Sequence, residues 1–211
     1  MRLEIASTKA IKYACMNFHY AKAVPMVQIA FSVFNNENEW CGVICYSIGA
    51  NNNISKPYSL SQGQVCELVR MALNGKQEST SKAMSISLRL LIKHNPLIKL
   101  VISYADTEQG HSGIIYQACN WYYTESKKGK VPILNGKRIH KRTYSSVHGS
   151  YAGVKMVETK PKHKYIYPLD RTLIPLCKSL SKPYPKYAIV AQGSASGIQP
   201  EDGGRPDPIA Q

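Results

Sequence analysis

Apolar segments rich in β-branched and aromatic residues alternate with polar turns through the first third of the chain. Residues 26–34 and 40–48 are two such segments, and the polar run 35–39 between them predicts a β-hairpin. The polar, Asn-rich run 49–59 follows and predicts a loop. Residues 65–73, VCELVRMAL, then predict a further, buried strand.

The pattern changes to helical spacing after this strand. Ser79 is suited to cap a helix, because its hydroxyl can accept a hydrogen bond from a backbone N–H of the first turn. Apolar residues then recur on one side of the helix, among them Met84, Leu88 and Leu91. Pro96 ends the pattern, so we expect a buried helix that reaches about His94.

A strand and a second helix are expected next, over residues 99–104 and 113–123. One face of that second helix is assigned to the core and consists of Ile115, Cys119 and Tyr122. The other face is assigned to a site and consists of Tyr116, Asn120 and Tyr123. Residues 142–150 and 164–168 predict further strands.

The order of these elements predicts an α/β fold with a mixed sheet. The chain of 211 residues is long enough for one domain, which we place at residues 1–191. Residues 192–211 contain Gly, Ser, Pro and acids with little to bury, and predict a disordered C-terminal tail. No apolar run is long enough to span a bilayer, and residues 1–20 lack the apolar core of a signal peptide, which favours the cytoplasm.

Cysteine spacing argues against a structural metal site. The six cysteines lie at positions 15, 41, 45, 66, 119 and 177 and form no CxxC pair. Free cysteine behaves as a small core residue, so buried thiols are favoured over metal ligands. A metal held by Asp106 and His111 needs a third ligand that the sequence does not identify, so the metal requirement is left open.

The charge is large and uneven. The formal net charge is +14, and residues 126–164 contain eleven Lys or Arg against the single acid Glu158. A field of one sign on this scale favours a polyanionic partner, most often nucleic acid, over a basic protein without such a partner. The candidate DNA contacts are Lys127, Lys128, Lys130, Lys137, Arg138, Lys141 and Arg142.

Reactive groups are densest in the run SYADTEQGHSGIIYQACNWYY, residues 103–123. Two glycines flank His111 and Ser112 and predict a tight turn between strand and helix. Asp106 and His111 are candidates for general acid and base, although Asp106 is also able to cap the turn and His111 to fill it. Ser112 is a candidate nucleophile or proton relay, or a helix N-cap.

The predicted strand 65–73 adds one more candidate. Glu67 is surrounded by apolar residues of that strand, where a carboxylate needs a partner or a raised pKa. Glu67 is therefore either a general base or the partner of Arg70.

Glu67-Leu68-x-Arg70 on a strand, followed by the run 103–123, resembles the Mom family of phage DNA-modification proteins, which are similar to GNAT-fold acyltransferases. The resemblance implies a GNAT-like mixed central sheet flanked by helices. It implies that the protein acts on double-stranded DNA in the host bacterial cytoplasm and converts adenine to N6-carbamoylmethyladenine, which protects DNA from host restriction.

This activity would give the aromatic and amide groups of the run specific roles. A base that leaves the helix needs stacking and edge contacts. Tyr116 and Trp121 offer aromatic faces, and the Asn120 amide can pair with adenine. Core packing is the other explanation for Trp121. By its resemblance to GNAT-like sites, Tyr104 is a candidate acid towards the leaving group.

The sequence leaves the identity of the group donor open. GNAT proteins hold coenzyme A with an R/Q-x-x-G-x-G/A loop, and the corresponding residues 74–82 here have one glycine instead of two. The helix start and the polar residues Lys76, Ser79, Thr80, Ser81 and Lys82 either hold an anion or form a plain N-cap. The fold implies acetyl-CoA, whereas the product's extra nitrogen is explained by glycyl-tRNA, with glycyl transfer to N6 followed by rearrangement.

Two other functions stay open. One is a GNAT N-acetyltransferase that acts on a small amine or a protein. The other is a DNA-binding protein without catalytic activity.

Overall fold

The computed structural model describes residues 1–49, 53–139 and 141–185. Within these residues eight strands form one sheet, in the spatial order β1-β2-β3-β4-β5-β8-β6-β7. The strands are β1 (Arg2–Ile5), β2 (Ile29–Phe34), β3 (Trp40–Ser47), β4 (Val65–Leu73), β5 (Leu100–Asp106), β6 (Tyr122–Leu134), β7 (Lys137–Arg138) and β8 (Met156–Pro168). The helices are α1 (Thr8–Asn17), α2 (Thr80–His94), α3 (Ile114–Ala118), α4 (Lys141–His148) and α5 (Ile174–Leu180).

The N-terminal half confirms the elements with strong periodicity. β2 and β3 form the predicted antiparallel hairpin, and β4 has the predicted bounds. α2 begins after Ser79, whose hydroxyl accepts a hydrogen bond from the backbone N–H of Lys82 at 3.2 Å. The two helices of this region are α1, which was not predicted, and α2, which was.

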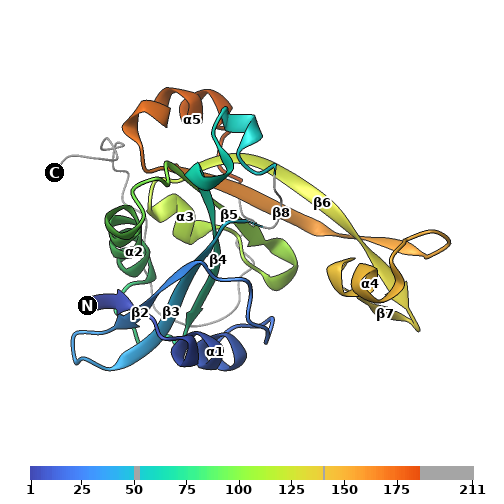
Figure 1. Ribbon diagram of the computed structural model, residues 1–211, viewed down its shortest axis with the longest axis horizontal. Helices are drawn as coiled ribbons and strands as arrows, with labels where there is room; N and C mark the ends of the chain where they lie inside the picture. Colours follow the sequence, from blue (N-terminus) through green and yellow to red (C-terminus); the bar gives the residue numbers. More distant parts are fainter. Residues whose placement is uncertain (50–52, 140, 186–211) are drawn as a thin grey trace.

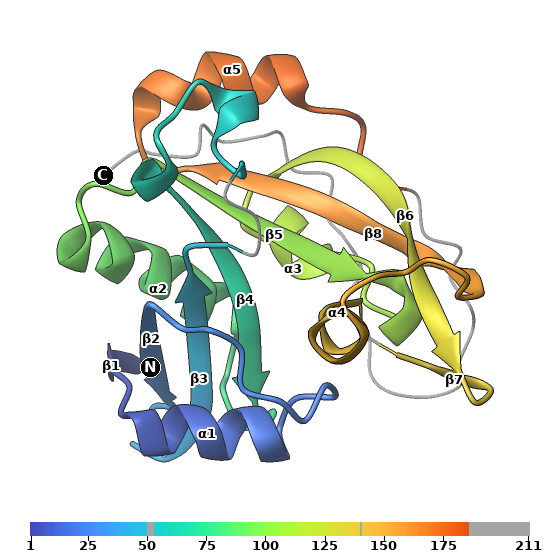
Figure 2. The ribbon, with the colours of Figure 1, turned by 45° about the vertical axis from the view of Figure 1, so that its right-hand side comes forward.

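β4 and β5 are the one parallel pair among the described strands, and they pair over only three residues each. Val65–Glu67 lie beside Leu100–Ile102, and beyond this point the two strands diverge, as Figure 2 shows. β8 then pairs with β5 along its whole length and with β6 on its other side. The divergence leaves a gap in the middle of the sheet.

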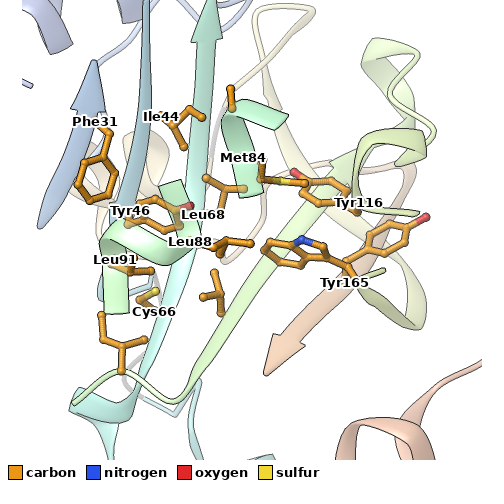
Figure 3. Close-up of a cluster of buried hydrophobic side chains, with 14 of the residues drawn as sticks. Phe31, Ile44, Tyr46, Cys66, Leu68, Met84, Leu88, Leu91, Tyr116 and Tyr165 are labelled. Atoms are coloured by element: carbon orange, nitrogen blue, oxygen red, sulfur yellow. The ribbon is translucent and has the colours of Figure 1, made fainter. Parts of the chain in front are cut away.

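Helices cover both faces of the sheet. The main core lies between the sheet and α2 with α3, where Leu68 and Tyr46 of the strands meet Met84 and Leu88 of α2 (Figure 3). The opposite face is covered at one end by α1 and at the other by α5. Alternation along the strands explains the two faces, because Leu68 belongs to the first and Val69 to the second.

β6 and β8 are 13 residues long and extend beyond the rest of the sheet. Figure 1 shows this long pair, with β7 and α4 at its far end. We call residues 126–164 the arm. The predicted strand over 164–168 is the end of β8, but the strand predicted over 142–150 is wrong, because those residues lie mostly in α4.

The helix predicted over 113–123 is confirmed only in its first part. α3 ends at Ala118, Asn120 has a left-handed φ of 56°, and β6 begins at Tyr122. The turn at Asn120 reverses the chain so that Tyr122 and Tyr123 pair with β8. The assigned helix faces therefore do not exist. The predicted tail, residues 192–211, lies outside the described residues.

Two smaller predictions concern cysteines and membranes. All six cysteines are free, and five of them are buried, as expected for core thiols. Within the described part of the chain, no helix is both long enough and apolar enough to cross a bilayer.

Candidate active site

A cleft of about 460 Å³ occupies the gap between β4 and β5. Its walls come from both faces of the sheet, because Leu68 and Met71 of the α2 face and Arg70 of the α1 face all line it. The predicted catalytic candidates all line this one cleft, namely Glu67, Tyr104, Asp106, His111 and Ser112. The tertiary structure thus brings together residues that the chain separates by up to 45 positions.

A side-chain hydrogen bond links β4 and β5 where their backbones cease to pair. β4 carries one extra residue, Val69, because Tyr46 pairs with Leu68 and the next residue back, Cys45, pairs with Arg70. The Ser103 hydroxyl donates to the Leu68 carbonyl at 2.8 Å, and the Tyr116 hydroxyl lies 2.8 Å from the same Ser103 oxygen. These bonds take the place of the ladder that the diverging strands no longer form.

Asp106 sits at the end of β5 with three sets of contacts. One carboxylate oxygen lies 2.8 Å from Lys162 Nζ, and the other accepts the backbone N–H of Glu108 at 3.1 Å. The Asp106 carbonyl accepts the backbone N–H of His111. Asp106 therefore caps its turn, which was one of its two expected roles. Its carboxylate is also largely buried at the cleft wall and paired with a lysine.

Three rings line the cleft mouth in a row that the sequence did not predict. The rings of His19 and Tyr20 lie 4.2 Å apart, and those of Tyr20 and His111 lie 5.5 Å apart. Burial, followed by the positive charge of Arg70, lowers the pKa of His19 to about 4. His19 is therefore neutral at physiological pH.

Tyr104 and Glu67 connect the cleft to a second hollow. This hollow of about 520 Å³ shares Glu67, Tyr104 and Lys162 with the cleft and continues along the arm past Lys127 and Lys164. Tyr104 is 40% exposed, and burial of the remainder raises the pKa of its phenol. The phenol is therefore protonated at neutral pH, as an acid requires.

The predicted base-binding residues are not grouped in the cleft. Trp121 is fully buried between the rings of Tyr116 and Tyr167, so its assignment as a stacking platform is wrong. Tyr116 is 7% exposed, its ring stacks on Tyr165, and burial raises its pKa to about 12. Asn120 is exposed and does not line the cleft. Of the three, only Tyr116 touches the cleft, as part of its floor.

The predicted donor loop makes contacts within itself and with the turn between β2 and β3. Lys76 lies 3.6 Å from Glu39, the side chain of Gln77 donates to the Thr80 hydroxyl, and the hydroxyls of Ser79 and Ser81 lie 3.0 Å apart. The plain N-cap is what the structure contains, and none of Lys76, Ser79, Thr80, Ser81 and Lys82 lines the cleft. Anion binding by this loop stays a prediction.

The predicted DNA contacts all lie on the arm. Lys127, Lys128 and Lys130 are exposed on β6, Lys137 and Arg138 on β7, and Lys141 and Arg142 belong to α4. Asp106, Lys162 and Lys127 are direct neighbours across β5, β8 and β6 and point to the same face. The arm's basic surface therefore leads into the cleft.

Metal ligands are not grouped in the part of the chain that the structure describes. No cluster of three or more His, Cys, Asp or Glu residues suited to a metal ion occurs there. His111 and Asp106 are linked through the backbone of their turn and acquire no third ligand of this kind.

Comparison with known proteins decides the family, because the model of the Mom protein family matches residues 1–186. The chain belongs to the Mom protein family. The protein named methylcarbamoylase mom, from Escherichia phage Mu, is 26% identical over 174 residues, which cover 78% of this chain and 72% of that protein.

Among solved structures, one described as a phosphinothricin N-acetyltransferase is similar to this Mom-family chain, with a TM-score of 0.50 at 10% identity. The match covers 81% of this chain and 99% of that one. An acetyltransferase from Bacillus subtilis, solved with CoA, has a TM-score of 0.46 at 10% identity. That match covers 80% of this chain and 98% of the other. With the mixed sheet flanked by helices, the first likeness confirms the predicted GNAT-like fold.

Four cleft residues of this Mom-family chain were missed, namely His19, Tyr20, Arg70 and Lys162. The consecutive rings of residues 18–20 are visible in the sequence. Their position at the cleft follows from α1, which directly precedes them and was not predicted. Arg70 was considered only as a partner of Glu67, and Lys162 only as part of the arm's charge.

Proposed function

We propose that this protein is a transferase that converts adenine in double-stranded DNA to N6-carbamoylmethyladenine. The observation that carries the proposal is the junction of the cleft with the arm, where Asp106, Lys162 and Lys127 stand side by side on one face. A basic surface that leads to a cleft with carboxylates suits a base delivered by a polyanion. Membership of the Mom family and the name of the phage Mu relative support the same activity.

The chemistry assigned to the cleft follows from the weakness of the acceptor. The N6 amine of adenine is delocalised into the ring, so a base must remove a proton as the new bond forms. Glu67 and Asp106 are the two carboxylates of the cleft able to do this. We assign protonation of the leaving group to Tyr104, which lines both hollows. His111 and Ser112 lie on the loop at the other side of the cleft.

The donor is either an acyl-CoA, as the fold suggests, or an aminoacyl ester such as glycyl-tRNA. In the second route the N6 nitrogen attacks the glycyl carbonyl carbon, the ester C–O bond breaks, and the tRNA hydroxyl leaves with a proton. The free amine of the transferred glycyl group then attacks adenine C6 and closes a five-membered ring. Cleavage of the original C6–N6 bond leaves N6 as the amide nitrogen of the carbamoylmethyl group.

Expression in a bacterium tests the function directly. The DNA is digested to nucleosides and the adenine fraction is weighed by mass spectrometry, with a Glu67→Gln, Asp106→Asn double variant as the inactive control. We expect the mass of carbamoylmethyladenine with wild-type protein only. Unmodified adenine from soluble, folded wild-type protein overturns the proposal, and tight coenzyme A binding with indifference to DNA would then identify an ordinary N-acetyltransferase.

Isotope labelling tests the rearrangement separately. DNA whose adenine N6 carries ¹⁵N is modified, and the position of the label in the product is read by fragmentation. The rearrangement predicts the label in the terminal amide. Label retained on the nitrogen attached to the ring excludes the rearrangement without affecting the proposed product.

A further inference from the structure

Among the residues that the structure describes, Arg70 is a cation of the cleft without an acidic partner. It follows the extra residue of β4 and pairs across the sheet with Cys45, so its side chain belongs to the α1 face, beside Cys15 and His19. The ion pairs formed within residues 1–49, 53–139 and 141–185 do not include Arg70. Asp106, one of the cleft's two carboxylates, is engaged by Lys162 instead.

The guanidinium group is also incompletely hydrogen bonded. Nη1 donates to the Val69 carbonyl at 2.9 Å, whereas Nε is buried and has no hydrogen-bond partner. Burying a charged donor without an acceptor is unfavourable. Arg70 lines the cleft, so a ligand bound there can contact its side chain.

The neighbours of Arg70 favour an anion. Burial, followed by the positive charge of Arg70, lowers the pKa of His19, so the ring beside Arg70 is neutral. A guanidinium presents a planar fork that matches two oxygens of a phosphate or carboxylate. A two-oxygen anion in the cleft would supply the acidic partner that the guanidinium lacks among the described residues.

The position of Arg70 relative to the arm selects the source of that anion. Lys127 and Lys162 lie on the same face of the sheet as Arg70, and Lys162 reaches the cleft that Arg70 lines. Phosphates of one strand spread along this face can follow Lys127 and Lys162 to Arg70. We infer that Arg70 binds a phosphate of the DNA strand that carries the acceptor adenine, and so anchors the flipped nucleotide in the cleft. This inference rests on the proposed function.

The test compares the binding of deoxyadenosine 5′-monophosphate with that of deoxyadenosine, by calorimetry or NMR titration of the full chain. Wild-type protein is expected to prefer the phosphorylated form by about tenfold, the effect of one charge-assisted contact. Arg70→Gln should reduce the preference to about one, and Arg70→Lys to an intermediate value because lysine lacks the fork. Lys93→Gln, on the exposed side of α2 and outside the arm, should retain it.

Several outcomes overturn the inference. Equal binding of the two compounds by wild-type protein does so even if Arg70→Gln fails to fold. An unchanged preference in folded Arg70→Gln does so as well. Weaker coenzyme A binding in that variant, with the nucleotide preference intact, would assign Arg70 to the donor instead. Unmodified cellular DNA together with an Arg70-dependent nucleotide preference rejects the proposed function but not the phosphate contact.

Discussion

The carboxylate of Asp106 and the ammonium group of Lys162 lie 2.8 Å apart, on neighbouring strands at the junction of the cleft and the arm. The carboxylate side is mostly buried and the lysine side is half exposed. The pair therefore joins a carboxylate suited to proton transfer with an ammonium group suited to phosphate binding. Its position connects the cleft to the basic surface along which we propose that DNA enters.

Asp106→Asn separates the charge of this residue from its role in the turn. The amide oxygen can still accept the backbone N–H of Glu108, so the turn and the thermal unfolding midpoint should be preserved. Loss of a general base is expected to lower DNA modification by about 100-fold or more, measured by mass spectrometry of nucleosides. Full modification by Asp106→Asn would assign the base to Glu67, and Glu67→Gln is the companion variant.

Gly113→Ala tests how tightly the loop beside the cleft is packed. Gly113 has a φ of +85°, and a Cβ there would lie 2.5 Å from the Tyr165 ring. We expect a loss of about 2–4 kcal/mol of stability, measured by urea unfolding. Gly110→Ala is the matched control, because its φ is +74° but no atom lies within 4 Å of the added Cβ. It should cost only about 1–2 kcal/mol. Equal losses in the two variants would contradict the packing argument.

Trp121 is predicted to be a structural residue. Trp121→Ala should cost about 3–5 kcal/mol in the free energy of unfolding, because it leaves a large cavity between Tyr116 and Tyr167. Trp121→Phe should cost much less, since the buried indole N–H has no hydrogen-bond partner to lose. Urea unfolding measures both changes. A stable Trp121→Phe variant that no longer modifies DNA would restore a functional role for the indole.

The lysines of the arm should govern the salt dependence of DNA binding. Lys130→Gln with Lys137→Gln removes two exposed charges, and is expected to lower the slope of log K against log salt by about 2. The control replaces the exposed Lys93 of α2 and Lys178 of α5 in the same way and should leave the slope unchanged. Fluorescence anisotropy at several salt concentrations measures the slopes. The same decrease in both double variants would show that net charge alone is responsible.

His19 should make stability depend on pH. Because burial and then Arg70 lower its pKa from 6.5 to about 4, the unfolded chain binds its proton more readily than the folded one. The stability that His19 contributes is therefore present above about pH 6.5 and is lost as pH falls towards 4. We expect an effect on the order of 1 kcal/mol after solvent screening. Urea unfolding at pH 4.5 and 7 should show a smaller difference for His19→Gln, and an unchanged difference would refute the assignment.

Local periodicity predicted the elements whose partners are near in sequence. The hairpin of β2 and β3, the bounds of β4 and the Ser79-capped helix α2 all depend on alternation, turn residues and a helical stripe. The run 103–123 also placed Tyr104, Asp106 and His111 correctly at one cleft, because a strand end and its turn are adjacent in the chain.

Other features depend on segments that meet only in the folded protein. Helical spacing after Gly113 did not show that the chain turns at Asn120 to pair with β8, so Trp121 was assigned to a site although β8 helps to bury it. His19 follows α1 in the chain and lines the cleft because α1 packs on the face of the sheet opposite α2.

The sequence by itself therefore determined the family, the mixed α/β fold and the chemical groups available for the proposed transfer. Tertiary structure decided which groups share the cleft, because the gap exists only where β4 and β5 stop pairing after three residues. The side chains that fill or line such a gap come from both faces of the sheet and from strands distant in the chain. No local pattern encodes that divergence.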